Sequence, residues 1–453
     1  MSSTSRYLQI RPDNIPSNGK VSFKNGFPVL SFTISAQSAV LDPRSIRVNG
    51  KFQVYSDNAS PPTPVYSDDA SQITMDSRTG IYSVMDQLLI RHVKSKQICE
   101  HIRHYNKYMN AYLGVTSSKQ DLIGHLNGTC LTAPNAEAMF NHVVANGAAV
   151  DASKVDKSFS AHLPCGFLMS GNSINLMPNS FGGVQIEIHL SPDSNCLYSR
   201  QGNAVNADAH YELSDIMLTC EVHDPAPDDM AMLQNETEGA LTFNTITSLY
   251  TTINTNNAQL QYNVGLKNLQ SAFLLFCPAN NINTITENSL TNTYPSNTDN
   301  SIAGFRRIQW LKGGVKYPQN FDVTTNIEIS GNADSTNGRY VVSDGQLAKQ
   351  FVEAIIPDLL LDRTSLSDGN LNREYSMVNN TTAGSYLQLP DGGGLFGLGI
   401  RYSQFNSGQD FSTEQFGVSL ESELSSDNPV AVFIYLKNKT TLAWNSNGVQ
   451  LLS

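Results

Sequence analysis

Residues Gly392–Gly397 (GGGLFG) match the GxGxxG spacing of loops that bind dinucleotides. In such loops a strand precedes the glycines, and a helix follows whose N-terminus holds the pyrophosphate. Here Pro390 precedes the glycines, and the next residues (Gly-Ile-Arg-Tyr at 399–402) predict a strand instead of a helix. We therefore interpret this segment as a glycine-rich turn and predict no cofactor-binding residues.

Metal ligands are the second chemistry to consider. His101 and His104 are three residues apart in a predicted helix, and His92 lies just upstream, but no further ligands follow at a suitable spacing. The cysteines form no CxxC pair, and those at 99, 220 and 277 lie in apolar segments, where free cysteine is a small buried hydrophobe. We predict no metal site. The six cysteines are Cys99, Cys130, Cys165, Cys196, Cys220 and Cys277.

Nucleophilic and acid–base catalysis has no sequence support either. The chain contains no GxSxG elbow and no phosphate-binding GxxxxGK[ST] loop. The acidic pairs Asp68-Asp69 and Asp228-Asp229 lie in loops, without the DxDxDG pattern of a calcium loop. The sequence therefore predicts no catalytic residues and no enzymatic activity.

Composition limits the partners. The 453-residue chain has a net charge of −11 and only 15% charged residues, which disfavours a general nucleic-acid surface because such a surface needs a basic stripe. We interpret the basic clusters at 91–96, 103–107 and 306–316 as solvated faces or subunit contacts. Residues 1–18 lack the apolar core of a signal peptide, and no run reaches the ~18 apolar residues of a membrane span. We expect an intracellularly made, soluble protein.

The elements that must position these residues form two similar halves. We predict domains at 1–223 and 240–453, joined by a linker at 224–239 whose Asp224–Asp229 segment contains two prolines. Each half combines many short strands with one amphipathic helix, near 95–113 in the first half and near 344–356 in the second. The first helix is predicted from the spacing of Ile98, Ile102, Tyr105, Met109 and Tyr112.

Strand patterns are clearest near the end of each half. Alternating residues predict half-buried strands at Val184–Leu190 and Tyr211–Val222, while Val430–Leu436 is apolar throughout, as in a strand covered on both faces. Asn25-Gly26, Asn49-Gly50 and Gly313-Gly314 predict hairpin turns. A further short helix is predicted at 134–146. The short strands and frequent turns favour sandwiches over a parallel α/β fold.

In its order of segments, the chain resembles the double jelly-roll major capsid proteins of the tectivirus–adenovirus lineage, most of all those of virophages, polinton-like viruses and other small eukaryotic DNA viruses. Each motif is short, and the resemblance rests on their order and spacing along nearly the whole chain. The segments are Leu41–Gly50, Asp76 with Gly80–Ser83, Gly183–Ile188, Tyr211–Asp215, Gly304–Trp310, Gly314–Pro318 and Val430–Leu436.

This resemblance implies an all-β fold with minor helices, built as two tandem eight-stranded antiparallel jelly rolls with helical insertions. It implies a major capsid protein that forms homotrimeric, pseudo-hexagonal capsomers, which tile an icosahedral shell. The expected partners are further copies of the chain, neighbouring capsomers, and penton and minor capsid proteins, with no direct sequence-specific nucleic-acid contact. The protein is expected in the virion, and the sequence leaves open whether the shell encloses a membrane.

Two other classes of function remain open at this level. A viral fibre or a lectin-like carbohydrate-binding protein of two β-sandwiches would present exposed aromatic platforms, and the chain has only Trp310 and Trp444. A β-rich hydrolase would need acids that converge in space, which the loop aspartates do not indicate.

Overall fold

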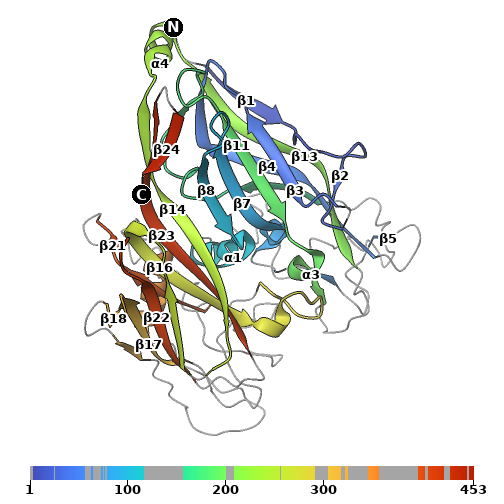
Figure 1. Cartoon of the computed structure of the whole chain (residues 1–453). Helices are drawn as coiled ribbons and strands as arrows, with labels where there is room; N and C mark the ends of the chain where they lie inside the picture. Colours follow the sequence, from blue (N-terminus) through green and yellow to red (C-terminus); the bar gives the residue numbers. More distant parts are fainter. Residues whose placement is uncertain are drawn as a thin grey trace.

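The structure is a computed structural model, and it describes most of the strands and helices of the 453-residue chain (Figure 1). The predicted helix at 134–146 and most of the GGGLFG motif lie outside the described residues. The described residues are 4–24, 26–56, 63–64, 73–74, 76, 79–116, 157–199, 209–255, 257–290, 305–317, 322–324, 345–356, 396–403, 407–422, 429–445 and 448–452.

Two antiparallel sheets form the first half of the chain. One has the strand order β1-β13-β4-β10, with β2, β5 and β9 pairing at its flanks, and the other has the order β3-β11-β7-β8. Their facing side chains form a buried core. The strands are β1 (Thr4–Ile10), β2 (Lys20–Val21), β3 (Val29–Ile34), β4 (Val40–Ser56), β5 (Thr63–Pro64), β7 (Met85–His92), β8 (Ile98–Arg103), β9 (Lys157–His162), β10 (Ile174–Asn175), β11 (Val184–Leu190) and β13 (His210–Asp224).

The second half has the same arrangement. Its sheets have the orders β14-β23-β16-β20, flanked by β21 and β24, and β15-β22-β17-β18, flanked by β19. The strands are β14 (Gly239–Ile253), β15 (Asn257–Tyr262), β16 (Leu266–Pro278), β17 (Phe305–Lys312), β18 (Val315–Lys316), β19 (Asp322–Thr324), β20 (Gly397–Arg401), β21 (Gln409–Phe411), β22 (Phe416–Ser422), β23 (Val430–Asn445) and β24 (Gly448–Leu452).

Counting the main strands of each half from one to eight gives the same two sheets twice, 1-8-3-6 and 2-7-4-5. This is the wrapped strand order of a jelly roll. The fold is therefore two tandem antiparallel jelly rolls with minor helices, as predicted. We call them the first roll and the second roll. The short pair of β6 (Ile73–Thr74) and β12 (Tyr198–Ser199) lies outside the four main sheets.

Helices are few among the described residues. The second predicted helix is confirmed as α5 (Gly345–Ile355), and the chain between the rolls forms α4 (Pro227–Asn235). We predicted this acidic, proline-containing segment as a linker; β13 ends at Asp224, and a new helix begins at Pro227, because a proline in the first helical turn loses no backbone hydrogen bond. The remaining helices are α1 (Tyr105–Thr116), α3 (Asp193–Cys196), η1 (Gly80–Val84) and η5 (Ala279–Asn281).

The first predicted helix, near 95–113, needs a correction. Its N-terminal part is β8, and α1 begins only at Tyr105. The regular apolar spacing ran across two elements, and Ile98 is 40% exposed on its strand. His104 separates the two elements with a φ of 52°, a left-handed backbone conformation outside the regular range of both a strand and a helix.

Two predicted hairpins were also wrong. Asn49-Gly50 lies inside the continuous strand β4, where a Cβ on Gly50 would stand 2.9 Å from the Phe159 ring, so the glycine serves close packing instead of a turn. Strands β2 and β3, which flank Asn25-Gly26 in the sequence, do not pair with each other as a hairpin; they pair with β13 and β11, in different sheets. The hairpin at Gly313-Gly314 is confirmed: both glycines have positive φ, and β17 pairs with β18.

Among the described residues, no strand up to Asp224 pairs with a strand from Gly239 onward. We therefore propose the division predicted from the sequence, with domains at 1–223 and 240–453 and a linker at 224–239. Among the described residues, none of the helices has the length and apolar character needed to cross a membrane.

Candidate functional site: the joint between the two rolls

The most elaborate set of side-chain contacts lies where the two rolls meet, and we call this contact surface the joint. Helix α1 belongs to the first roll but packs on the outer face of the β14-β23-β16 sheet of the second roll (Figure 1). The Tyr108 ring lies 5.7 Å from the Tyr435 ring and 6.2 Å from the Phe273 ring, and Tyr435 and Phe273 stack at 5.1 Å. The Tyr435 hydroxyl donates a 2.8 Å hydrogen bond to the His104 carbonyl. The sheet of one roll is thereby covered by a helix of the other.

Helix α5 covers the adjoining part of the same sheet face. Phe351 makes an edge contact with Phe273 at 6.3 Å, and the Ser271 hydroxyl donates to the Ala354 carbonyl at 2.6 Å. A Cβ on Gly397 would stand 2.0 Å from the Phe351 ring, so this glycine is what lets the helix approach β20. Gly397, the last glycine of the GGGLFG motif, thus begins a strand, as predicted, and has a packing role.

Glu100 on β8 is a buried carboxylate that links the rolls. It is 2% exposed, and it accepts backbone N–H groups from Gly166 (3.2 Å) and Phe167 (2.7 Å) of the first roll and from Ile246 (3.0 Å) of the second. Burial raises the pKa of Glu100, and the N–H donors oppose that rise. The side chain satisfies three buried amides, two on one roll and one on the other.

Asp76 forms a second polar link. Its Oδ1 accepts the Thr79 amide, the Thr79 hydroxyl and the Asn110 side-chain amide of α1, each at 2.8 Å. Its Oδ2 accepts the side-chain amide of Asn288, which belongs to the second roll, at 2.9 Å. All four residues are buried. The Asp76 motif singled out in the sequence therefore orients η1, α1 and a loop of the other roll together.

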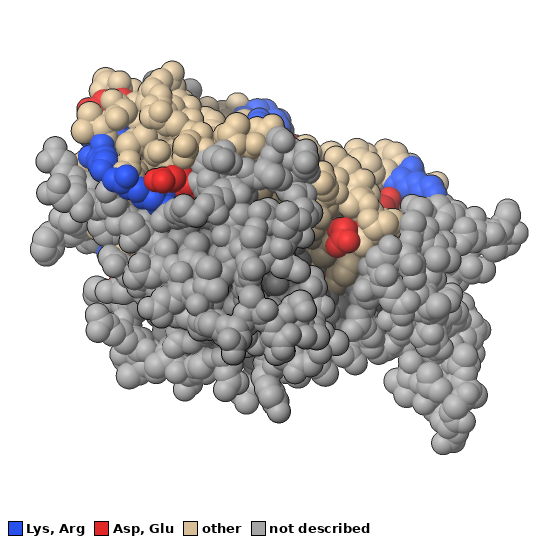
Figure 2. All heavy atoms as spheres, turned by 90° about the horizontal axis from the view of Figure 1, so that it is seen from below, with Lys and Arg blue, Asp and Glu red and all other residues tan. Residues whose placement is uncertain are grey.

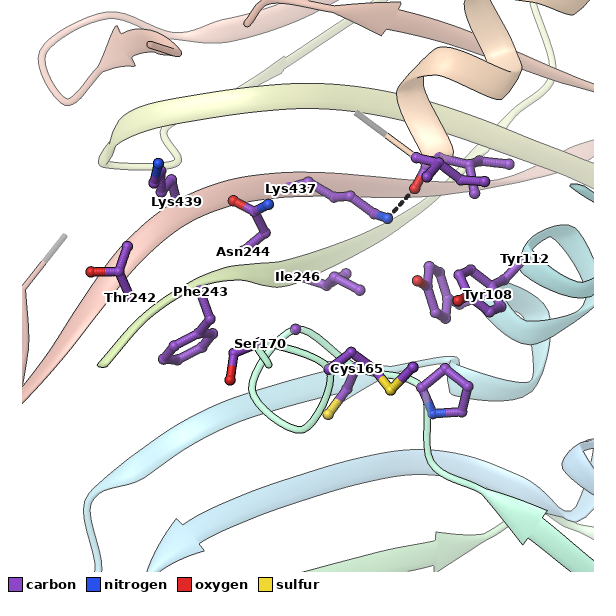
Figure 3. Close-up of a pocket in the computed structure, with 15 residues that line it drawn as sticks. Tyr108, Tyr112, Cys165, Ser170, Thr242, Phe243, Asn244, Ile246, Lys437 and Lys439 are labelled. Carbon is purple, nitrogen blue, oxygen red and sulfur yellow. Dashed lines mark hydrogen bonds between the residues drawn. The ribbon is translucent and has the colours of Figure 1, made fainter. Parts of the chain in front are cut away.

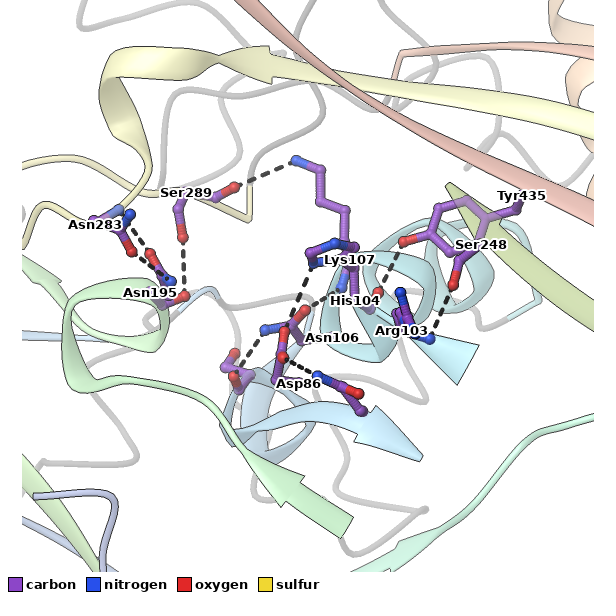
Figure 4. A network of polar contacts seen from close by, with 12 residues as sticks. Asp86, Arg103, His104, Asn106, Lys107, Asn195, Ser248, Asn283, Ser289 and Tyr435 are labelled. Carbon is purple, nitrogen blue, oxygen red and sulfur yellow. Dashed lines mark hydrogen bonds and ion pairs between the residues drawn. The ribbon is translucent and has the colours of Figure 1, made fainter. Parts of the chain in front are cut away.

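Lys107 corrects, for this residue, our interpretation of the 103–107 basic cluster as a solvated face or a subunit contact; Arg103 is exposed. This lysine is 1% exposed. Its Nζ donates to the Ser289 carbonyl at 3.4 Å (Figure 4). The same Nζ lies 5.4 Å from the centre of the Phe433 ring. A desolvated ammonium is favourable only with such acceptors and π faces around it. Lys107 is therefore part of the joint.

His104 completes this side of the joint. Its ring contacts Phe433 at 5.1 Å and Tyr250 at 5.5 Å, both on the second roll, and its Nδ1 lies 3.7 Å from a carboxylate oxygen of Asp86 (Figure 4). Burial lowers the pKa of His104, and the Asp86 charge opposes the change. The neighbouring Arg103 amide donates to the Ser248 hydroxyl at 2.9 Å.

The far side of the joint is aromatic. Phe167 meets Phe243 edge-on at 5.4 Å, and Phe181 meets Trp444 in the same way at 5.5 Å. Between these contacts the backbones touch, because a Cβ on Gly166 would stand 1.7 Å from the Asn244 carbonyl oxygen. Only glycine fits at this position.

The predicted histidine candidates are not brought together. His101 lies on β8 and contacts Gln87 at 3.0 Å, His92 contacts Ser95 and the Phe181 carbonyl, and His104 lies in the joint. Among the described residues, no three His, Cys, Asp or Glu side chains are grouped as metal ligands. The described cysteines, five of the six, are free and buried, as expected for Cys99, Cys220 and Cys277.

Sequence reasoning missed the polar residues of the joint: Glu100, Lys107 and Asn288. Glu100 and Lys107 lay within the predicted amphipathic helix, where charged residues are expected to face solvent. One usable signal was the two-sided apolar character of Val430–Leu436, which is buried throughout. It indicated that something covers the outer face of β23, but not that the cover comes from the other roll.

The fold is therefore a double jelly roll. Each roll has the complete strand order, and helix α1 of the first roll packs on the second roll. No known protein family's sequence profile matches the chain, and no curated protein sequence does. Several solved structures, however, have a similar fold over nearly the whole chain.

A subunit of the PBCV-1 virus capsid aligns over 100% of this chain and 97% of its own, with a TM-score of 0.58 and 12% identity. The Faustovirus major capsid protein aligns over 98% of this chain and 91% of its own (TM-score 0.56, 10% identity). A chain of the Sputnik virophage aligns over 99% and 88% (TM-score 0.55, 9% identity). At these identities, the likeness establishes the double jelly-roll fold.

Proposed function

We propose that this protein is a non-enzymatic major capsid protein that forms homotrimeric capsomers of an icosahedral virus shell and resides in the virion. The observation that carries the proposal is the repeated strand order over the whole chain, with the two rolls locked side by side. Three such chains around a threefold axis give six rolls, so a trimer has the outline of a hexagonal tile. The capsid proteins with the same fold support this reading.

The joint supports the proposal because a tile must be rigid. Buried aromatic stacking together with the polar links at Glu100 and Asp76 holds the two rolls in one relative orientation. If the two rolls could move freely relative to each other, the trimer would not keep a sixfold outline. A capsid subunit therefore needs such a joint, whereas two independent binding modules on a linker do not.

The surface is consistent with protein–protein assembly. On the face shown in Figure 2, the described basic and acidic side chains form small separate groups among neutral residues, without a continuous basic stripe. The rival fibre or lectin function would need exposed aromatic platforms. Trp310 is 1% exposed, and Trp444 packs on Phe181, so neither tryptophan forms such a platform. Penton and minor capsid proteins are the further partners that we propose.

Light scattering after size exclusion tests the proposal. We expect a particle of about three times the 49.5 kDa of the chain and, by electron microscopy, pseudo-hexagonal blocks. A strict monomer at micromolar concentration, with no assembly at high protein concentration, would overturn the capsomer proposal.

A further inference from the structure

The contact between the two rolls follows the strand order. Among the eight main strands of each roll, β8 is the fifth of the first roll and β14 is the first of the second roll. These two strands lie side by side in the joint (Figure 1). Glu100 of β8 accepts the Ile246 amide of β14, and the Arg103 amide of β8 donates to the Ser248 hydroxyl of β14. The fifth strand of one roll therefore meets the first strand of the other.

The same contact covers the eighth strand of the second roll, β23. Figure 3 shows Tyr108 and Tyr112 of α1, the helix that follows β8, together with Ile246 and Lys437 of the second roll around a cavity of about 480 Å³. Strand β23 is buried on both faces as far as Asn438. Strand β13 has the same place in the first roll, but along it buried residues alternate with partly exposed ones. Among the described residues, its outer face therefore lacks the cover that β23 has.

Each chain also has a first-strand edge and a fifth-strand edge that the joint does not use. Strand β1, the first of the first roll, pairs only with β13 among the described strands, and β18, the fifth of the second roll, pairs only with β17. Figure 1 shows β1 and β18 on opposite sides of the molecule, with β8 and β14 between them. The two rolls are thus arranged head to tail, and a second copy can repeat their contact at either side.

Exposed apolar side chains lie on these two edges. Tyr7 of β1 is 72% exposed, and Val315 of β18 is 61% exposed. Among the large apolar side chains of the described residues, these two and Met232 of α4 (74%) are the most exposed, followed by Leu452 (52%). A single exposed apolar side chain is ordinary on a protein surface. Here, however, two of the three most exposed ones lie on the two edges that the strand order selects.

We infer that β18 of one copy lies along β1 of the next, with Val315 close to Tyr7, so that neighbouring chains repeat the contact that the joint makes within each chain. The outer face of β13 is then covered by the second roll of the neighbouring copy. Because each copy contacts its two neighbours through different surfaces, three copies can close into a ring. This assignment rests on the proposed capsomer function, and it names the strands that form the interface.

Cross-linking of introduced cysteines tests the contact in the full-length protein. The double variant with Tyr7→Cys and Val315→Cys is treated with a short bis-maleimide and separated on a denaturing gel. We expect bands of two and three linked chains, because every junction of the ring then holds one pair of thiols. The described native cysteines are buried, and the unaltered protein treated in the same way gives the background.

The single variants test the head-to-tail direction. Neither Tyr7→Cys nor Val315→Cys alone should link chains, because the contact places Tyr7 next to Val315 and not next to another Tyr7. When the two single variants are co-expressed, a mixed ring has one junction with both thiols, so we expect linked pairs and no linked trimers. A chain with Tyr7→Cys and Met232→Cys is the matched control. Met232 is equally exposed but lies outside both edges, so this pair should not link chains.

A disruptive variant gives a second measurement. Tyr7→Asp combined with Val315→Asp should raise the dissociation constant of the trimer roughly tenfold or more, while Met232→Asp should leave it unchanged. Circular dichroism should be unaltered in both, since the three side chains are exposed. A trimer in which the Tyr7 and Val315 thiols link no more chains than the Met232 control overturns the inference and leaves the capsomer proposal standing. A protein that stays monomeric in light scattering rejects the capsomer proposal itself.

Discussion

Strand β11, the seventh main strand of the first roll, and strand β23, the eighth of the second, are both second in the order of their sheets but have different environments. Along β11 buried and half-buried residues alternate, so one face is in the core and the other faces outward. Along β23 every residue from Val430 to Asn438 is buried. The difference arises because α1 and α5 cover the outer face of the β23 sheet, while β11 has a polar outer face. One roll donates a helix and the other receives it, so equal topology does not mean equal roles.

Replacing the aromatic that receives α1 should have the largest effect. Tyr435→Ala removes a fully buried ring and its hydrogen bond to His104, and should lower the free energy of unfolding by about 3–5 kcal/mol. Gln185→Ala, on the outer face of β11, should cost less than about 1 kcal/mol. Urea unfolding followed by tryptophan fluorescence measures both. Equal losses would contradict the different roles of the two strands.

Replacing Glu100 should cause the second-largest loss in the free energy of unfolding. Glu100→Leu leaves three buried N–H groups without an acceptor and should cost about 2–4 kcal/mol. Glu100→Gln keeps one acceptor oxygen and should lose less. The same denaturation assay ranks the variants. If Leu were tolerated as well as Gln, the hydrogen bonds across the joint would be energetically irrelevant.

The pair of Asp76 and Asn288 can be isolated by a double-mutant cycle with Asp76→Ala and Asn288→Ala. A buried hydrogen bond to a charged group predicts a coupling of about 1.5–3 kcal/mol. The exposed pair of Lys20 and Glu212, within the first roll, serves as the control cycle and should give at most about 1 kcal/mol. A larger coupling energy for Lys20 and Glu212 than for Asp76 and Asn288 would contradict the proposed importance of the joint.

Lowering the pH should decrease the free energy of unfolding by a smaller amount than these substitutions do. The folded-state pKa of His104 is lowered from the ordinary value of 6.5, so the unfolded chain takes up a proton first as pH falls. Its contribution to stability is present above pH 6.5 and is lost as pH falls through the folded-state pKa. Unfolding midpoints at pH 7.5 and 5.5 measure the loss, which His104→Gln should reduce. The pKa values of His92, His101 and His162 are lowered as well, so part of the pH dependence of stability should remain in His104→Gln. An unchanged slope in His104→Gln would exclude the joint histidine as its source.

The sequence predicted α5 and the closing strands well, because alternation and two-sided burial are local patterns, whereas the two-roll fold was predicted from the resemblance in the order of segments. It placed α1 wrongly because β8 and α1 follow each other with compatible apolar spacing, and only the left-handed backbone at His104 separates them. It could not find the joint, because Glu100 and Ile246, or Asp76 and Asn288, are far apart in the chain and meet only once both rolls exist. Turn signals failed at Asn49-Gly50, where close packing of Phe159 explains the glycine.

The donated helix also has a consequence for synthesis of the chain. On a ribosome, α1 emerges long before β23, the strand whose Tyr435 and Phe433 contact the start of the helix. Until then the aromatic face of α1 lacks its partners on β23. The nascent first roll is therefore an unfinished, adhesive intermediate until the second roll has closed over it.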